Sequence, residues 1–186
     1  MYKQYRNLIF LLIIALLVWL VSFYWNSWLS ETMMRHQVIQ LPAMILLGAA
    51  TGLYFRKLRI NTLATQISVL IILMTSIIFW MLPLSVDLAV IYPKYNRAMH
   101  LHMFVTGLVM VGVLRATIFE VRVAFLGMLA AMTLAVGITL YSFNILLCSS
   151  FNIWQQQEAG YYLMFLSGGI FLLTYIIFFR GAGRVQ

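Results

Sequence analysis

Charged residues are scarce in this sequence, and acidic residues are the scarcest. Only 9% of its 186 residues are charged and only 4 are acidic, whereas soluble domains carry about 25% charged residues. A surface exposed to water cannot be built from so few charges. Paired carboxylates, an activated nucleophile and a phosphate-binding loop are all missing, so the sequence gives no reason to expect an enzyme. The single cysteine, Cys148, excludes an internal disulfide and a cluster of thiolate ligands.

Apolar residues are abundant instead, at 64% of the chain. They form six long runs without the alternation of β-strands, and a helix that crosses a bilayer needs about 20 residues. Backbone polar groups in lipid have to be paired within the structure, which favours helices for runs of this length. We therefore predict an all-α polytopic membrane protein in which residues 1–186 form one transmembrane domain. Its six helices are expected at residues 8–28, 37–55, 62–84, 98–114, 121–147 and 160–179.

The basic residues predict the orientation of these helices. If the N-terminus is cytoplasmic, the cytoplasmic segments contain Lys3, Arg6, Arg56, Lys57, Arg59, Arg115, Arg122, Arg180 and Arg184, and the opposite side contains only Arg35, Lys94 and Arg97. Short cytoplasmic loops of membrane proteins are rich in Lys and Arg. We therefore predict cytoplasmic N- and C-termini in a cell (inner) membrane. The net charge of +8 then reflects topology and contact with anionic lipid, not a nucleic-acid partner.

The three histidines, His36, His100 and His102, all fall at predicted extracytoplasmic helix ends. On the second helix, His36 shares a face with Met33 and Gln40, because residues three or four apart point the same way. On the fourth helix, the spacing places His102 with the methionines, and His100 lies about 200° around the helix from it.

Imidazole and thioether groups together suit copper, especially Cu(I). Methionine is also a common packing residue, and histidines at a membrane interface can be purely structural, so these interpretations stay open beside metal binding. The candidate metal ligands are His36, His100, His102, Met33, Met99 and Met103. Cys148, Gln40 and Glu158 lie near the same side of the membrane, and their participation is left open.

Two segments resemble a known family, the CtaG-type cytochrome c oxidase assembly proteins. The run from Met33 through Pro42 to Gly48 is similar to a family segment in which a helix opens with a histidine and a second histidine follows one turn later. The run from Met99 to Leu108 is similar to a later family segment, in which a histidine-containing helix start precedes an apolar stretch and a glycine. This chain departs from the pattern at Gln40, which occupies the place of the second histidine.

The resemblance implies a protein that handles copper at its extracytoplasmic face and supports assembly of a respiratory haem–copper oxidase or a related copper enzyme. Its partners would be membrane lipid and the subunits of that oxidase or copper enzyme. Two alternatives remain open. In one, His36 and either His100 or His102 hold a single b-type haem in a membrane electron carrier. In the other, the chain is a non-catalytic accessory subunit of a larger membrane complex, with structural histidines.

Several further residues lead to structural expectations. Pro42 lacks an N–H, so we expect an irregular helix around residue 38. Gly48 and Gly52 form a G-x-x-x-G pattern that allows close helix packing. We interpret Asp87 as a solvated loop charge, and we place Asn144 and Cys148 one turn apart at the end of the fifth helix. If the histidines form one site, the second and fourth helices have to be neighbours.

The orientation can be tested with reporter fusions. A reporter that is active only in the cytoplasm should be active after Gln186 and inactive when it is inserted near Lys94, because the two positions fall on opposite sides of the membrane. A reporter that is active only outside the cytoplasm provides the converse control. The reversed pattern would contradict the extracytoplasmic position of the histidines.

Overall fold

The computed structural model describes residues 2–54 and 62–182, and all regular secondary structure in these ranges is helical. Six helices are long and apolar enough to cross a membrane: Tyr5–Tyr24, Arg35–Tyr54, Leu63–Met81, Pro93–Ala116, Phe119–Ser142 and Ile153–Gly181. The predicted all-α bundle of six transmembrane helices is therefore confirmed. Of the basic residues used to predict the orientation, Arg56, Lys57, Arg59 and Arg184 lie outside the described residues, as does the side chain of Lys3.

The helices follow one another along the chain with two π-helical stretches, η1 and η2, near the N-terminal end. The elements are α1 (Tyr2–Trp19), η1 (Leu20–Tyr24), α2 (Asn26–Ser30), η2 (Arg35–Gln40), α3 (Leu41–Tyr54), α4 (Leu63–Met81), α5 (Pro83–Ile91), α6 (Pro93–Ala116), α7 (Phe119–Ser142) and α8 (Ile153–Ala182).

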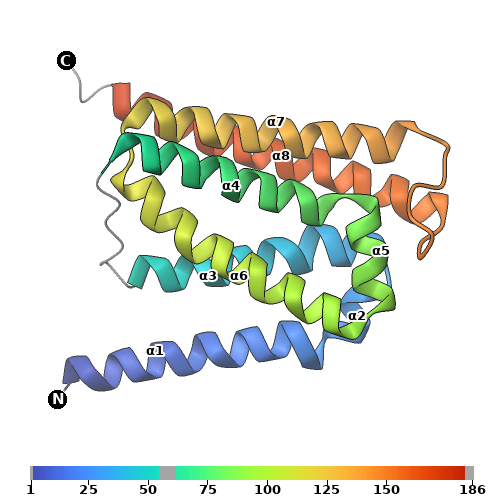
Figure 1. Cartoon of the computed structure of the whole chain (residues 1–186), viewed down its shortest axis with the longest axis horizontal. Helices are drawn as coiled ribbons and strands as arrows, with labels where there is room; N and C mark the ends of the chain where they lie inside the picture. Colours follow the sequence, from blue (N-terminus) through green and yellow to red (C-terminus); the bar gives the residue numbers. More distant parts are fainter. Residues whose placement is uncertain (1, 55–61, 183–186) are drawn as a thin grey trace.

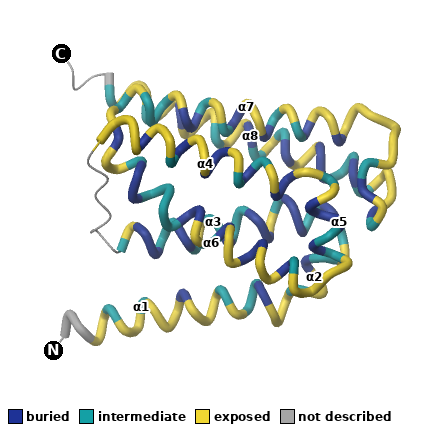
Figure 2. The backbone as a smooth tube through the Cα atoms, in the orientation of Figure 1, coloured by how far each residue is buried: buried dark blue, intermediate teal, exposed yellow. Residues whose placement is uncertain are grey.

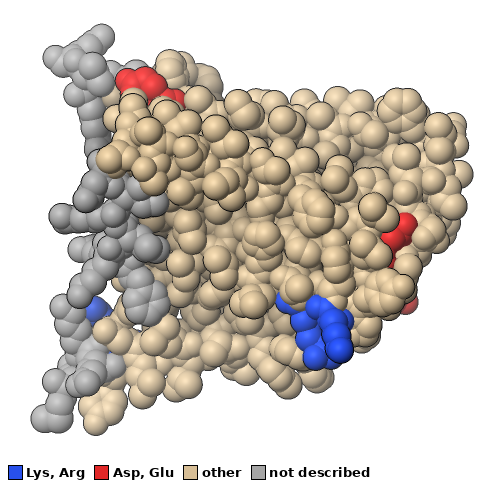
Figure 3. Space-filling view, in the orientation of Figure 1, with Lys and Arg blue, Asp and Glu red and all other residues tan. Residues whose placement is uncertain are grey.

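Two tightly packed helix pairs organise the bundle. Helix α3 packs along α6, α7 packs along α8, and α4 contacts both α6 and α7. Helix α1 lies at the edge of the bundle and is mostly exposed (Figures 1 and 2). The start of α1 and the end of α8 lie at the same end of the molecule (Figure 1), and we call the opposite end, formed by α2, α5 and residues 143–152, the distal end. The face shown in Figure 3 carries few charged atoms among the described residues, as a surface in contact with lipid requires.

Glycines set the distance between α3 and α6. A Cβ atom added to Gly48 would overlap the backbone carbonyl of Phe104 on α6, and one added to Gly107 would overlap the carbonyl of Ile45 on α3. Gly52 is similarly close to the carbonyl of Leu108. Small residues let two helix backbones approach in a membrane, where van der Waals packing is a main source of attraction. The expected G-x-x-x-G contact is thus confirmed, and its partner is α6.

The predicted helix ends were least accurate at the distal end. Helix α6 begins at Pro93 rather than at residue 98, and proline is favoured at this first helical position because its missing N–H costs no hydrogen bond there. Helix α8 begins at Ile153 rather than at residue 160, and α7 ends at Ser142 rather than at residue 147. Helix α5 was not predicted. An apolar run marks only the part of a helix that lies in the hydrocarbon core. The helix itself can continue into polar sequence at the interface, so the starts of α6 and α8 were predicted too late.

These boundaries correct three expectations. Asn144 and Cys148 lie in the segment between α7 and α8, not one turn apart on a helix. Glu158, which comes just before the predicted helix at residues 160–179, lies within α8. Asp87 lies on α5 and is buried, with 9% of its surface exposed, so it is not a solvated loop charge.

The contact between α3 and α6 can be tested with matched glycine substitutions. Gly107→Ala should lower the free energy of unfolding by about 1–3 kcal/mol, because the new methyl group overlaps the α3 backbone. Gly168→Ala is the control, since its added Cβ meets no atom within 4 Å, and it should be neutral or slightly stabilising. Thermal unfolding in detergent would measure both. Equal behaviour of the two variants would contradict the packing.

Candidate functional site

Two of the three histidines are buried at the distal end. His36 on η2 is 0% exposed and His100 near the start of α6 is 2% exposed. Because α3 continues η2 and packs along α6, the expected proximity of the second and fourth helices is confirmed. Asn26 connects their surroundings, because its Oδ1 accepts from Gln40 on η2 and from Asn96 on α6. The distal end therefore contains a buried histidine pair, which we call the His36–His100 pair.

The helix is irregular where Pro42 predicted it to be, and the irregularity has a specific form. Residues Arg35–Gln40 are π-helical, and the N–H of Leu41 donates to the carbonyl of His36, five residues earlier. Pro42 cannot supply the next N–H, so the regular α-helical ladder is interrupted at this point. Single π-helical turns within α-helices often occur at functional sites. Here the π-helical turn contains His36 and Gln40.

Hydrogen bonds fix the protonation of His36. The Gln40 Nε2 amide donates to the carbonyl of Val21 (3.1 Å) and to Asn26 Oδ1 (3.0 Å). Gln40 Oε1 therefore points to His36 Nδ1, at 2.7 Å. Because Oε1 can only accept, the proton of the neutral imidazole is on Nδ1 and the lone pair is on Nε2. This Nε2 is buried and has no hydrogen-bond partner.

His100 has fewer hydrogen bonds to its ring nitrogens than His36 has. Both of its ring nitrogens are buried without a hydrogen-bond partner, and in either neutral tautomer one of them carries a lone pair. One turn earlier on α6, Asn96 Nδ2 donates to Asn26 Oδ1 at 2.8 Å, the same oxygen that accepts from Gln40. An amide network thus joins η2, α2 and α6 around the pair. Buried polar atoms normally have partners, and each exception calls for an explanation.

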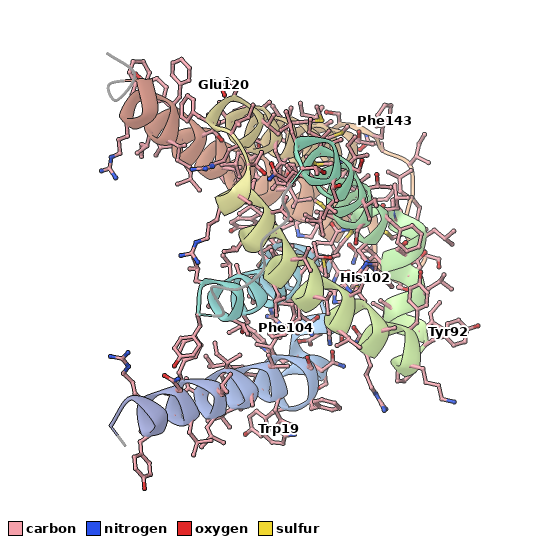
Figure 4. The ribbon with its side chains drawn as sticks, turned by 60° about the vertical axis from the view of Figure 1, so that its left-hand side comes forward. Trp19, Tyr92, His102, Phe104, Glu120 and Phe143 are labelled. Atoms are coloured by element: carbon pink, nitrogen blue, oxygen red, sulfur yellow. The ribbon has the colours of Figure 1, made fainter. Side chains whose placement is uncertain are left out.

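His102 has the opposite environment. It is exposed, and Figure 4 labels it on α6. The Trp80 indole N–H donates to His102 Nδ1 at 2.9 Å, which leaves the proton on Nε2 to be donated to Ser76 Oγ, also at 2.9 Å. Both ring nitrogens are therefore occupied. The spacing had placed His102 rather than His100 with the buried methionines, and the structure corrects this.

The position of His100 follows from the glycine contact. His100 and Gly107 are seven residues apart, so they lie on nearly the same face of α6, and Gly107 is the residue that touches α3. The face of α6 that meets the second helix is thus marked by the glycine and not by the methionines. In the sequence, Gly107 could have indicated that His100, and not His102, lies on the face of this helix that meets the second helix.

The methionines divide between two buried clusters. Met99 and Met103 are buried with Met44, Leu41 and Trp80 in one cluster. Met33 belongs to a neighbouring cluster with Met81, Cys148 and Leu163. The structure thus brings together Met99 and Met103 but separates Met33 from them in packing. Met44 was not among the predicted ligands, although it lies one turn beyond Gln40. Asn26 and Asn96 were also missed, since single asparagines gave no pattern.

Cys148 is a buried thiol at the distal end. Its Sγ lies 3.5 Å from the carbonyl of Pro83. Burial, together with the negative charge of Asp87, raises the pKa of Cys148 to about 12, so it remains protonated at neutral pH. The thiolate is the form that binds metals. Cys148 therefore contributes packing to the distal end.

Asp87 holds the segment between α7 and α8 against α5. Its carboxylate accepts hydrogen bonds from the backbone N–H and hydroxyl of Ser149 (2.7 and 3.0 Å) and from the backbone N–H of Ser150 (2.9 Å). Burial alone would raise the pKa of Asp87, but these hydrogen bonds outweigh it, and the pKa lies below the ordinary value of 3.8. The ionised carboxylate therefore fastens this segment at neutral pH.

Within the part of the chain that the structure describes, no three residues of the types His, Cys, Asp and Glu come together as a metal site would require. A metal bound by the His36–His100 pair would thus need other donors, such as thioethers. Comparison with protein-family models, curated proteins and solved structures finds no match for this chain. The fold and the site define a membrane protein with six transmembrane helices and a buried pair of neutral histidines at one end.

The fastening role of Asp87 predicts a pH dependence. Asp87→Ala should lower the free energy of unfolding by about 2 kcal/mol at pH 7, because hydrogen bonds to a charged acceptor are lost. A lowered pKa stabilises the fold above the ordinary pKa of 3.8, and this stability is lost as the pH falls through the folded-state pKa. The difference between variant and wild type should therefore shrink in acid.

Thermal unfolding of wild type and Asp87→Ala in detergent, from pH 7 down through the pKa of Asp87, would measure this difference in stability. Glu120→Ala is the control, because Glu120 is exposed and lies at the other end of α7. A difference between Asp87→Ala and wild type that stayed constant into acid would contradict the assignment.

Proposed function

We propose that this protein binds Cu(I) at the His36–His100 pair on the extracytoplasmic face of a cell membrane and supports assembly of a respiratory haem–copper oxidase or a related copper enzyme. The observation that carries the proposal is the set of three buried ring nitrogens without partners, His36 Nε2 and both nitrogens of His100. Leaving a buried polar group unpaired costs about 1–3 kcal/mol. A bound metal ion would use one lone pair from each imidazole and recover part of this cost.

The donor set favours Cu(I) over divalent ions. Imidazole and thioether are soft, neutral ligands that suit Cu(I), whereas hard cations prefer oxygen. In the described residues no carboxylate or thiolate cluster lies beside the pair to neutralise a double charge. Burying a monovalent ion is less costly than burying a divalent one, because the desolvation penalty rises with charge. Met99, Met103 and Met44 are buried nearby on the same two helices and offer thioether sulfurs.

Gln40 has a positioning role in this proposal. It occupies the place where the CtaG-type pattern has a second histidine, and its Oε1 accepts from His36 Nδ1. A partner on the second ring nitrogen fixes the tautomer and orientation of a metal-binding histidine. The departure from the family pattern thus replaces a ligand with a group that supports one. The two residues of the pair then come from two different helices.

A cavity lies beside Gln40, the residue that contacts His36, although neither histidine of the pair lines it. It has a volume of about 690 Å³ and lies between η1, α2 and the start of α3. Its wall includes Trp25, Trp28 and Gln40, and the two tryptophans are about half exposed. Tryptophan is enriched at the membrane–water interface. An ion or a partner protein at the interface would reach His36 from this side.

Copper content would be measured in three histidine variants in parallel, after loading with Cu(I) under reducing conditions. His36→Ala and His100→Ala should each lose copper, because each removes one of the two available lone pairs. His102→Ala should retain the wild-type amount, since both of its ring nitrogens are already bonded to Ser76 and Trp80. His102→Ala is a matched control, two residues from His100 on the same helix.

Two further measurements separate the alternatives. Gln40→Leu should bind copper about 10- to 100-fold more weakly without abolishing binding, as expected for the loss of a partner to a ligand. The absorbance spectrum of the purified protein tests for haem, since a Soret band would replace the copper proposal with a b-type haem. Wild-type copper content in His36→Ala would refute the site. Stoichiometric partner subunits without bound metal would indicate an accessory subunit.

A further inference from the structure

A second cavity lies inside the bundle, between the α3–α6 pair and the α7–α8 pair. Its volume is about 240 Å³. The wall is apolar except for Gln37 on η2 and Thr133 on α7, and its apolar members include Met81, Leu129 and Ile170. Neither histidine of the pair lines it, and of the thioether donors proposed for copper it shares only Met103.

The polar part of the cavity wall offers one acceptor without a hydrogen-bond partner, Gln37 Oε1. The Thr133 hydroxyl donates to the carbonyl of Leu129 within its own helix, at 2.8 Å. Gln37 Nε2 donates to the carbonyl of Met81 at 3.2 Å, which leaves its amide oxygen facing away from that contact. Gln37 is 1% exposed, and its Oε1 is buried without a partner. A ligand would satisfy this oxygen by donating one hydrogen bond.

The wall of the cavity reaches the lipid-facing surface. Leu46 on α3 and Leu173 on α8 both line it, and they are 67% and 50% exposed. Both belong to helices long enough to cross the membrane. Gln37 and Leu46 are nine residues apart, or about 14 Å along a helix at 1.5 Å per residue. The cavity thus runs from a polar group at the distal end to an opening on the lipid-facing side of the bundle.

Water and phospholipid are poor occupants of this space. An ordered water needs about 2–4 polar partners, and an apolar engineered cavity of about 150 Å³ stays dry and binds benzene instead. The ester carbonyls of a phospholipid accept hydrogen bonds and cannot pair with Gln37 Oε1. A molecule that fits has an apolar body of roughly eight non-hydrogen atoms, at about 30 Å³ each, and one neutral donor.

We propose that this cavity binds a neutral, membrane-soluble alcohol. Its hydroxyl group donates to Gln37 Oε1, its first carbons fill the space between the two helix pairs, and the rest of its chain leaves between Leu46 and Leu173. The hydroxyl then lies near the distal end of the bundle, at the level of the membrane interface where small neutral polar groups reside. Binding of the alcohol does not depend on copper.

The test uses the full-length protein in detergent and two photoreactive probes, a long-chain alcohol with a diazirine on its chain and its methyl ether. The alcohol should label residues of the cavity wall, and the ether should bind about fivefold more weakly because it cannot donate the hydrogen bond. Gln37→Leu should remove the difference between the two probes, since it removes the acceptor at similar volume. Equal binding of alcohol and ether to the wild type would overturn the proposal.

A second pair of variants tests the position of the ligand. Ile170→Phe fills the cavity and should abolish labelling by the alcohol, whereas Leu172→Phe should not, because Leu172 is 60% exposed on the lipid side of the same helix. Undiminished labelling of Ile170→Phe would also overturn the proposal. Copper content separates this site from the other one: Ile170→Phe should keep copper and lose the alcohol, and His36→Ala should lose copper and keep the alcohol.

Discussion

The close approach of α3 and α6 is the contact on which the rest of the structure depends. Gly48 and Gly107 remove the side chains that would separate the two backbones. His36 and His100 lie toward the distal ends of these two helices, and both are buried there. Around this pair, the amides of Gln40 and Asn26 find partners across three elements. Steric contact in the middle of the membrane thereby determines the chemistry at its edge.

The polar groups around the His36–His100 pair are arranged by the geometry of amide hydrogen bonds. Amide hydrogen bonds impose a direction on each neighbour, because an amide has a distinct donor and acceptor. Gln40 accordingly fixes which nitrogen of His36 is protonated. The only ion pair in the described residues links Glu31 and Arg35, at 2.8 Å on the exterior of this end. Around the His36–His100 pair the order comes from amide hydrogen bonds, and the buried carboxylate of this end, Asp87, is stabilised by its own hydrogen bonds to Ser149 and Ser150.

The sequence predicted the fold well and the site in part. Long apolar runs specify transmembrane helices, since nothing else satisfies the backbone in lipid. Helix ends were harder to predict, as α5 and the early start of α6 at Pro93 show. The sequence selected His36 and left the choice between His100 and His102 open. That choice depends on which face of α6 meets α3, and methionines indicate this poorly because they pack against many surfaces. The roles of Gln37 and Asn26 could not be predicted, because they depend on residues that are distant in the sequence.

If the His36–His100 pair binds Cu(I) as we propose, the scarcity of acids around it would give copper exchange a direction. Neutral imidazoles and thioethers leave the full charge of a bound Cu(I) uncompensated in a medium of low dielectric constant. A client protein that offers a thiolate would neutralise that charge on receiving the ion. Transfer toward such a client is then electrostatically downhill, and return is uphill. A carrier built in this way needs no other energy source for release, because its own ligands hold the cargo less favourably than an anionic acceptor does.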